Sequence, residues 1–282
     1  MLTARVPDAL DDEIATVLGT GSLGVEVAPS GPGMSELRVY LGEMDDAGSW
    51  RERAGRVLAA HGLEVAASQL AVEPVVDGRW VERWQASLAP IPLGDRFVVL
   101  PGAGASAHAG REPIRLVPGM AFGTGEHPTT RMCAAGLERL VAPGSTWLDL
   151  GTGTGLLAIL ASRCGAARVL AVDVDHEAVD VAREVIASNE ATALVEVRAG
   201  SIEARSGETF DGVVANIQSS FFITHARALA DALVEHGVLL ASGFLREDVD
   251  EISSALAAAA LAVEGISTDG PWVCLAARRL PA

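Results

Sequence analysis

Apolar positions in the second half of the chain alternate between short continuous runs and longer stretches with helical spacing. The runs predict strands at Thr146–Leu150, Arg168–Val172, Val195–Arg198, Gly212–Asn216 and Val238–Ser242. The stretches between them predict helices at Leu156–Arg163, Glu177–Asn189, about 220–235 and about 247–261. Strands that alternate with helices of this length predict a parallel sheet that is covered on both faces.

The end of the chain departs from this alternation. Val263–Ser267 and Trp272–Ala276 both read as strands, and they flank the turn sequence Thr268-Asp269-Gly270-Pro271. This pattern predicts an antiparallel hairpin at the edge of the sheet, which a simple dinucleotide-binding fold lacks.

A separate pattern occupies residues 1–75. Strand-like and helix-like segments follow one another in the order β-α-β-β-α-β, ending with a strand at Glu64–Leu70. That order predicts a small α+β ferredoxin-like domain. Residues 76–110 hold Trp80, Trp84 and the Gly/Ala/Ser-rich stretch Gly102–Gly110, and are predicted to be a linker. Residues 111–282 then form the second domain.

The glycine-rich turn after the first strand of this second domain indicates a cofactor site. Gly151, Gly153 and Gly155 follow Leu148-Asp149-Leu150 and precede an apolar helix. Glycines here allow a tight turn and a close approach of the backbone to a ligand. The spacing is GxGxG, whereas dinucleotide folds use GxGxxG with a pyrophosphate at the helix N-terminus. Asp149 is placed to orient the turn or to meet an ammonium group of the cofactor.

A second acid ends the next strand. Asp173 closes the apolar run Val169–Val172, 22 positions after Gly151. A carboxylate at this place accepts hydrogen bonds from the hydroxyls of a ribose. Asp175 is better suited than Asp173 to cap the following helix.

Composition excludes several classes of function. All 21 basic residues are arginine, so the chain has neither the Schiff-base lysine of a pyridoxal-phosphate enzyme nor the lysine of a Walker P-loop. The net charge of −16 disfavours direct binding to nucleic acid and favours a basic partner. Three scattered cysteines have no zinc spacing. No leader peptide or membrane span is recognised, so we expect a cytoplasmic protein without a metal site.

One segment resembles a known family closely. Met120–Thr130 reads MAFGTGEHPTT and meets every fixed position of FGTGxHPTT, the signature of the PrmA family. Members of this family are class I S-adenosylmethionine-dependent methyltransferases that modify lysines and the N-terminal amine of protein eleven of the large ribosomal subunit. The resemblance extends over about residues 75–282. It implies a Rossmann-like, seven-stranded sheet with a closing antiparallel hairpin, and S-adenosyl-L-methionine as the cofactor.

The resemblance also implies site residues. Thr130 and Asn216 would act at the methyl acceptor, where the Asn216 amide oxygen can accept a hydrogen bond from an incoming amine. The residues that it places on the cofactor, together with those of the glycine turn, are Phe122, Gly123, Thr124, Thr130, Asp149, Gly151, Gly153, Gly155, Asp173 and Asn216. His127 is interpreted as a support for the signature loop rather than as a base.

The sequence departs from the family pattern in two places. The family reads NILAGPL where this chain has Asn216-Ile217-Gln218-Ser219-Ser220-Phe221-Phe222, on the acceptor side of the pocket, and Gly200-Ser201 replaces an acid expected near the adenine. The first departure leaves open a methyltransferase of the same fold that acts on another protein lysine or on a small molecule. A nicotinamide-dependent oxidoreductase and a non-catalytic cofactor-binding module are remote alternatives. The basic ribosomal substrate agrees with residues 1–75, which carry 12 acids against 5 arginines and form the predicted substrate-recognition domain.

Overall fold

The protein forms two compact units in a computed structural model that describes residues 1–19, 22, 24–42, 45–63, 70–72, 89–101, 110–116 and 125–281. The smaller unit comprises Met1–Trp84 with Pro118–Met120, and the larger comprises Gln85–Val117 with Ala121–Ala282. Each unit buries hydrophobic side chains of its own.

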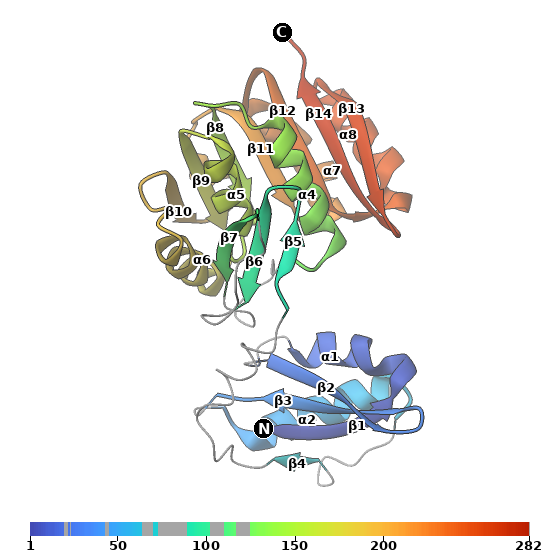
Figure 1. Cartoon of the computed structure of the whole chain (residues 1–282). Helices are drawn as coiled ribbons and strands as arrows, with labels where there is room; N and C mark the ends of the chain where they lie inside the picture. The colour runs from blue at the N-terminus through green and yellow to red at the C-terminus, as the bar shows by residue number, and fades with distance from the viewer. Residues whose placement is uncertain are drawn as a thin grey trace. The chain divides into compact units, whose positions relative to one another are not determined.

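The small unit follows the element order that its sequence predicts (Figure 1). Its elements are β1 (Leu2–Pro7), the short η1 (Asp8–Leu10), α1 (Asp11–Gly19), β2 (Gly24–Gly31), β3 (Met34–Tyr40), α2 (Ala47–Ala60) and β4 (Ala71–Val72). Its described strands pair antiparallel in the order β2-β3-β1-β4. The last predicted strand, Glu64–Leu70, lies largely outside the described residues, and the strand that completes the sheet is β4.

Alternating burial explains why this small sheet holds its two helices. Leu2, Ala4 and Val6 of β1 are buried, as are Leu37 and Val39 of β3. They form one core with Ile14 and Leu18 of α1 and with Trp50, Ala54 and Leu58 of α2. Period-two strand positions and helical positions therefore meet on a single face of the sheet.

The large unit is built on a sheet whose seven strands all lie within residues 125–281, a range described without a gap. Its strands are β8 (Thr146–Leu150), β9 (Arg168–Asp173), β10 (Val195–Ala199), β11 (Phe210–Asn216), β12 (Leu233–Leu245), β13 (Leu261–Asp269) and β14 (Trp272–Arg279). They are ordered β10-β9-β8-β11-β12-β14-β13, as Figure 1 shows from the yellow to the red edge. Pairing is parallel from β10 to β12, and β14 is antiparallel to both of its neighbours. The predicted class I methyltransferase sheet with its closing hairpin is confirmed.

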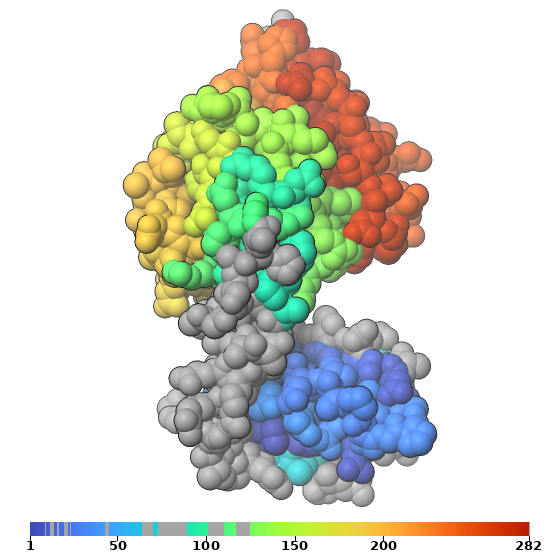
Figure 2. Space-filling view, in the orientation of Figure 1, coloured from blue at the N-terminus to red at the C-terminus, as the bar shows by residue number. Residues whose placement is uncertain are grey.

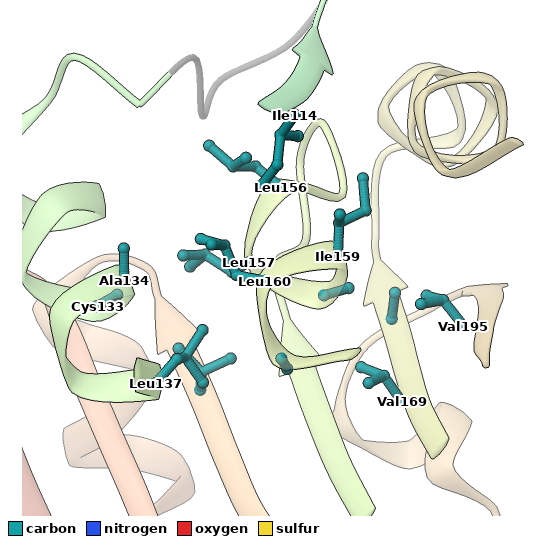
Figure 3. Close-up of a cluster of buried hydrophobic side chains, with 14 of the residues drawn as sticks. Ile114, Cys133, Ala134, Leu137, Leu156, Leu157, Ile159, Leu160, Val169 and Val195 are labelled. Atoms are coloured by element: carbon teal, nitrogen blue, oxygen red, sulfur yellow. The ribbon is translucent and has the colours of Figure 1, made fainter. Parts of the chain in front are cut away.

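Helices cover both faces of this sheet, as the continuous apolar strands predict. One face carries α4 (Pro128–Leu140), α5 (Leu156–Cys164) and α6 (His176–Ser188); the other carries α7 (Ser219–Asp231) and α8 (Val249–Ala258), with the short η3 (Ile202–Arg205) and η4 (Arg246–Asp248) between elements. Successive β8 residues point to opposite faces, so Trp147 belongs to the first core and Leu148 to the second. Figure 3 shows the first core, in which Leu137 of α4 and Leu157 and Leu160 of α5 gather above the strands.

Three further strands extend the first face. They are β5 (Ile91–Leu93), β6 (Phe97–Pro101) and β7 (Glu112–Leu116), joined in the order β5-β6-β7 among the described residues. Leu93, Phe97 and Ile114 enter the core formed with α4 and α5. Two of these strands fall in the range 76–110 that the sequence predicts to be a linker. In the space-filling view the teal strands lie over the green helices, and the red hairpin forms an edge of the unit (Figure 2).

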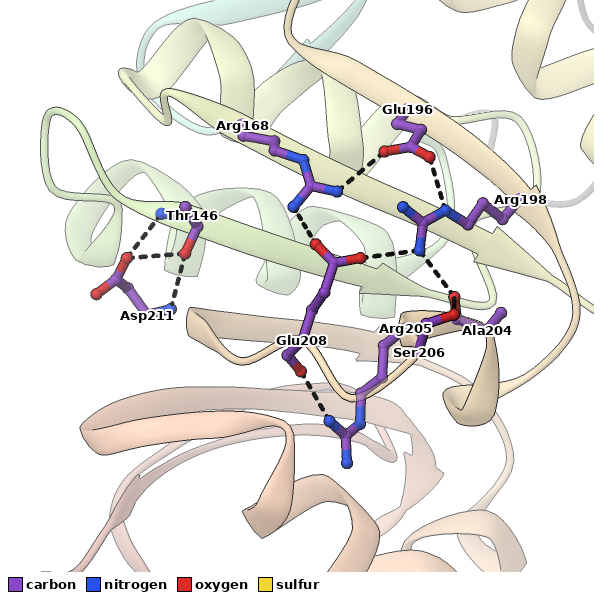
Figure 4. A network of polar contacts seen from close by, with 9 residues as sticks. All are labelled: Thr146, Arg168, Glu196, Arg198, Ala204, Arg205, Ser206, Glu208 and Asp211. Carbon is purple, nitrogen blue, oxygen red and sulfur yellow. Dashed lines mark hydrogen bonds and ion pairs between the residues drawn. The ribbon is translucent and has the colours of Figure 1, made fainter.

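Ion pairs close the opposite edge of the large sheet, at β9 and β10. Arg168 of β9 contacts Glu196 of β10 and Glu208, and Arg198 contacts the same two carboxylates (Figure 4). All four side chains are partly exposed, so each pair contributes little to the free energy of unfolding by itself. The network ties the edge strand β10 to the loop before β11.

Candidate active site

The glycine turn joins β8 to α5 and docks on the neighbouring strand. The backbone N–H groups of Gly151 and Thr152 both donate to the carbonyl oxygen of Val172, at 2.9 and 3.0 Å. Gly151, Gly153 and Gly155 all have positive φ, as the sequence predicts for a tight turn. The turn thus brings its backbone to the carboxyl ends of β8 and β9, where doubly wound folds bind ligands.

Both the backbone conformation and the lack of room for a side chain favour glycine at position 151. A Cβ atom built there would lie 2.4 Å from Cγ2 of Ile217, which follows β11. A side chain at position 151 would therefore collide with the segment that carries Asn216.

Asp173 holds the turn from the end of β9. Its Oδ2 accepts a hydrogen bond from the Gly153 N–H at 2.9 Å, and its Oδ1 accepts from the Asp175 N–H at 3.0 Å. Asp175 caps α6 by accepting from the N–H of Glu177, which confirms the role expected for it. The carboxylate of Asp173 lines a pocket, where the predicted contact with ribose hydroxyls remains a prediction.

Asp149 is fully buried and lies two residues before Gly151, where the turn begins. Its Oδ2 accepts from the Thr152 hydroxyl at 2.6 Å, while its Oδ1 has no hydrogen-bond partner among the described residues. Burial raises the pKa of Asp149 to about 7, although the Thr152 hydroxyl and the nearby Ala158 N–H act in the opposite direction. A buried carboxylate oxygen without a hydrogen-bond partner is costly, and a cationic group of a ligand could supply that partner.

A pocket of about 430 Å³ opens beside the turn. The turn and the strand ends supply one part of its lining: Leu150, Gly151, Gly153, Asp173, Val174, Gly200 and Ser201. The segment after β11 supplies the remainder: Asn216, Ile217, Gln218 and Phe221. Val174 leaves 71% of its surface exposed at this pocket, which suits a flat apolar ligand group.

Asn216, which lines this pocket, contacts Thr130, a residue that is distant in the sequence. Asn216 Nδ2 donates to Thr130 Oγ1 at 3.3 Å. Asn216 Oδ1 is buried and has no hydrogen-bond partner among the described residues. The Asn216 amide oxygen therefore has unused capacity to accept a hydrogen bond, and its role at the methyl acceptor stays a prediction.

The end of the signature segment starts α4. His127 is the N-cap residue: its Nδ1 lies 2.7 Å from the Thr129 hydroxyl and accepts from the Thr129 N–H at 3.4 Å. Burial, and secondarily the charge of Arg131, lowers the pKa of His127, which favours this neutral, accepting form. His127 therefore supports the segment, as interpreted from the sequence.

The structure brings part of the predicted site together. Gly151, Gly153, Asp173 and Asn216 line one pocket, and Thr130 contacts Asn216. Gly155 instead is the N-cap residue of α5, where a Cβ would meet Ile186 of α6 at 3.1 Å. Phe122, Gly123 and Thr124 lie outside the described residues.

The pocket role of Val174 was not predicted, whereas Gln218 and Phe221 were placed at the pocket only as members of the segment that departs from the family pattern. Val174 could have been found, because it directly follows the acid that ends β9. The place of Phe221 depends on α7, whose backbone is non-helical at His225, and the Phe221 ring stacks on that imidazole with centroids 4.2 Å apart.

Comparison with known proteins shows the family of the chain. The profile of the ribosomal protein L11 methyltransferase (PrmA) family matches residues 28–280. The chain belongs to the PrmA family. A PrmA relative from Pelotomaculum thermopropionicum, named ribosomal protein L11 methyltransferase, is 38% identical over 87% of this chain and 80% of its own length. A relative of the same name from Burkholderia cenocepacia is 40% identical over 75% of this chain and 69% of its own.

A solved structure of a PrmA relative supports the fold. The ribosomal protein L11 methylase from Lactobacillus delbrueckii subsp. bulgaricus superposes with a TM-score of 0.64 and 32% identity. It covers 69% of this chain and all of its own. Among the described residues of this PrmA chain, no helix is both long and apolar enough to cross a membrane.

Proposed function

We propose that this PrmA-family chain is a cytoplasmic S-adenosylmethionine-dependent N-methyltransferase whose acceptors are amines of ribosomal protein L11. The observation that carries the proposal is the pair formed by Asn216 and Thr130, in which the buried Asn216 amide oxygen has no hydrogen-bond partner among the described residues. A site of this kind offers a hydrogen-bond acceptor to an amine next to a cofactor pocket. Membership of the family supports the reaction, and the names of its relatives support the acceptor.

The described residues fit the proposed cofactor. A carboxylate that ends β9 suits a ribose, exposed Val174 suits an adenine ring, and the unsatisfied Asp149 Oδ1 suits an ammonium group near the turn. When bound, S-adenosylmethionine supplies a methyl group that is already activated by its positive sulfur. The protein is left with binding, orientation and the removal of water.

The acceptor amine must be neutral before it can attack. A lysine amine has a pKa of about 10.4 in water, and transfer into a partly closed pocket lowers that pKa because desolvation disfavours the ammonium form. The Asn216 oxygen and the Thr130 hydroxyl would then accept hydrogen bonds from the amine and direct its lone pair. No strong base is needed once the proton has left to solvent.

The first test is methyl transfer from tritiated S-adenosylmethionine to ribosomal proteins of a strain that lacks the enzyme. We expect label on L11. Asn216→Ala should lower transfer by on the order of 100-fold, because the amine loses its orienting acceptor. Asn189→Ala removes another buried asparagine of the same unit, one that binds the backbone of Arg115, and controls for general destabilisation.

Other outcomes separate the alternatives. Label on a different protein would keep the reaction and reject L11 as the acceptor. Cofactor binding without any labelled protein would favour a small-molecule acceptor or a binding-only module. Absence of S-adenosylmethionine binding by calorimetry would reject the proposal, and reduction or oxidation of a nicotinamide would replace it with an oxidoreductase.

The small unit is proposed to recognise the protein substrate. Residues 1–75 carry an excess of acids over arginines, and ribosomal proteins are basic. Removing this segment should abolish transfer to L11 while S-adenosylmethionine still binds the large unit. Unchanged turnover of L11 by the shortened chain would reject this role.

A further inference from the structure

The turn of the closing hairpin contacts the signature segment. Trp272 begins β14, and its ring lies edge-on to the imidazole of His127, with centroids 4.6 Å apart and an interplanar angle of 71°. His127 is the N-cap of α4. The end of the chain therefore lies against the first turn of the helix that carries Thr130.

A charged bridge makes the same connection. Arg131 of α4 donates through Nη2 to Oδ2 of Asp269, the last residue of β13, at 2.7 Å. Its Nη1 donates to the carbonyl oxygen of Glu126, just before the cap residue. One guanidinium thus joins the hairpin to the backbone on the N-terminal side of α4.

The hairpin turn is itself held from its other side. The Arg246 N–H donates to the carbonyl oxygen of Pro271 at 3.0 Å, and Arg246 Nε donates to that of Gly270 at 3.3 Å. Leu245 of β12 also pairs with Trp272 in the sheet. The turn is a fixed support, because both β12 and η4 restrain it.

The helix turn held by this support carries the residue that meets Asn216. Thr130 is the third residue of α4 and is almost wholly buried. A helix start displaced by a fraction of an ångström would lengthen its 3.3 Å contact with Asn216. Small errors in the position of a reacting group reduce the rate of a reaction strongly.

We propose that Asp269 and Trp272, in the hairpin turn, are positioning residues that hold His127–Arg131 so that Thr130 and Asn216 are set for methyl transfer. The role rests on the proposed function. Neither Asp269 nor Trp272 is among the described residues that line the cofactor pocket. They act through His127 and Arg131 rather than on the substrate.

The partial exposure of the bridge makes the proposal testable. The side chains of Arg131 and Asp269 are 42% and 44% exposed, so Asp269→Asn should change the thermal midpoint of unfolding very little. Glu264→Gln is the matched control. It breaks another exposed ion pair of the same hairpin, between Glu264 and Arg278 at 2.8 Å, away from α4.

The experiment compares Asp269→Asn, Trp272→Leu, Trp272→Phe and Glu264→Gln in the full-length enzyme. We expect kcat for L11 to fall by on the order of tenfold in the first two variants, with the dissociation constant of S-adenosylmethionine close to wild type. Trp272→Phe keeps an aromatic ring beside His127 and should recover most of the rate. Glu264→Gln should retain it.

Hydrogen exchange supplies a readout that does not depend on turnover. The Arg131 N–H donates to the His127 carbonyl oxygen in the first turn of α4. Its exchange should accelerate in Asp269→Asn and Trp272→Leu and should not in Glu264→Gln. A lower kcat with unchanged hydrogen exchange at Arg131 would overturn the proposal. So would kcat values in Asp269→Asn and Trp272→Leu that equal the kcat of Glu264→Gln.

This design separates the two hypotheses. If the wild-type enzyme transfers no methyl group to L11, the proposed function fails. The exchange comparison then still decides whether the hairpin turn holds the start of α4. Unchanged exchange in both hairpin variants would overturn that contact as well.

Discussion

Two buried oxygen atoms at the ends of neighbouring strands define the site at the scale of single residues. Asp149 Oδ1 and Asn216 Oδ1 both lack hydrogen-bond partners among the described residues. Their strands are adjacent, since β8 pairs with β11 and Asp149 lies opposite Val214. Leaving a polar atom buried and unpaired costs about 1–3 kcal/mol. A ligand that forms a hydrogen bond with such an atom removes this cost in the bound state. The two unpaired oxygen atoms therefore indicate a binding site.

Asp149 should make stability depend on pH. Its pKa is about 7 in the folded chain, against 3.8 for an ordinary aspartate, so the folded state holds a proton that the unfolded state has lost between these values. The free energy of unfolding should therefore fall as pH rises from about 4 to about 7, by on the order of a few kcal/mol.

Urea unfolding of the wild type and of Asp149→Asn across this pH range measures the effect. The variant should have the flatter profile, because its neutral amide does not ionise. Asp180→Asn, at a largely exposed carboxylate, should follow the wild type. Parallel profiles for the wild type and Asp149→Asn would contradict the prediction.

Individual residues differ in how far the sequence could predict them. Asp173 and Asn216 end apolar runs, and parallel strands place their carboxyl ends at one edge, so both could be assigned to the site. The ring contacts of Phe221 with His225 and of Trp272 with His127 could not be predicted, because they depend on how these side chains pack. Periodicity carries no information about such contacts.

At the scale of elements, the glycine turn is fitted to the segment after β11. Gly151 has a φ of 72°, and a Cβ there would collide with Ile217. Position 151 therefore combines a conformational cost with a steric one for any other residue.

Replacement of Gly151 by alanine should show both costs. Gly151→Ala is expected to destabilise the large unit by about 2 kcal/mol or more and to weaken S-adenosylmethionine binding. Gly144→Ala is the control for conformation alone, since Gly144 has a φ of 84° and a Cβ there would meet no atom within 4 Å. It should cost about 1 kcal/mol.

A double-mutant cycle isolates the collision. Ile217→Ala should partly rescue Gly151→Ala, because it removes the methyl group that the new Cβ meets. Unfolding by denaturant gives the coupling energy. Equal losses at positions 144 and 151 would show that the collision has no effect.

Element boundaries show where sequence patterns reach their limit. The helix expected at 247–261 ends at Ala258, because Ala260 adopts a left-handed conformation and Leu261 starts β13. β12 begins at Leu233, five residues before the expected strand, since polar Glu235 and His236 interrupt the apolar run. Strands β5 and β6 were missed because they are short and flanked by turn residues and prolines. The alternation of strands and helices was predictable because burial on both faces of the sheet imposes it.

At the scale of the molecule, the net charge of the chain should make binding of the proposed protein substrate more sensitive to salt than binding of the cofactor. The chain carries a net charge of −16, and its first 75 residues have many more acids than arginines. Attraction to a basic protein substrate acts over distances that salt screens, whereas a pocket contact is screened much less.

The Michaelis constant for L11 should therefore rise severalfold between about 50 and about 300 mM salt, through slower association. kcat should change much less. The dissociation constant of S-adenosylmethionine over the same range is the internal control. A Michaelis constant for L11 that does not change with salt concentration would contradict electrostatic recognition of L11 by the acidic chain.

The position of β14 has a consequence for biosynthesis. This strand is the last in the order of the chain, yet it lies inside the sheet, paired with β12 on one side and β13 on the other. A growing polypeptide that has not yet reached Trp272 leaves both neighbours with unpaired backbone edges. The parallel core can collapse early, but the catalytic unit closes only when its final strand emerges from the translating ribosome. Premature termination after the hairpin turn would therefore yield an open, aggregation-prone sheet rather than a slightly shortened enzyme.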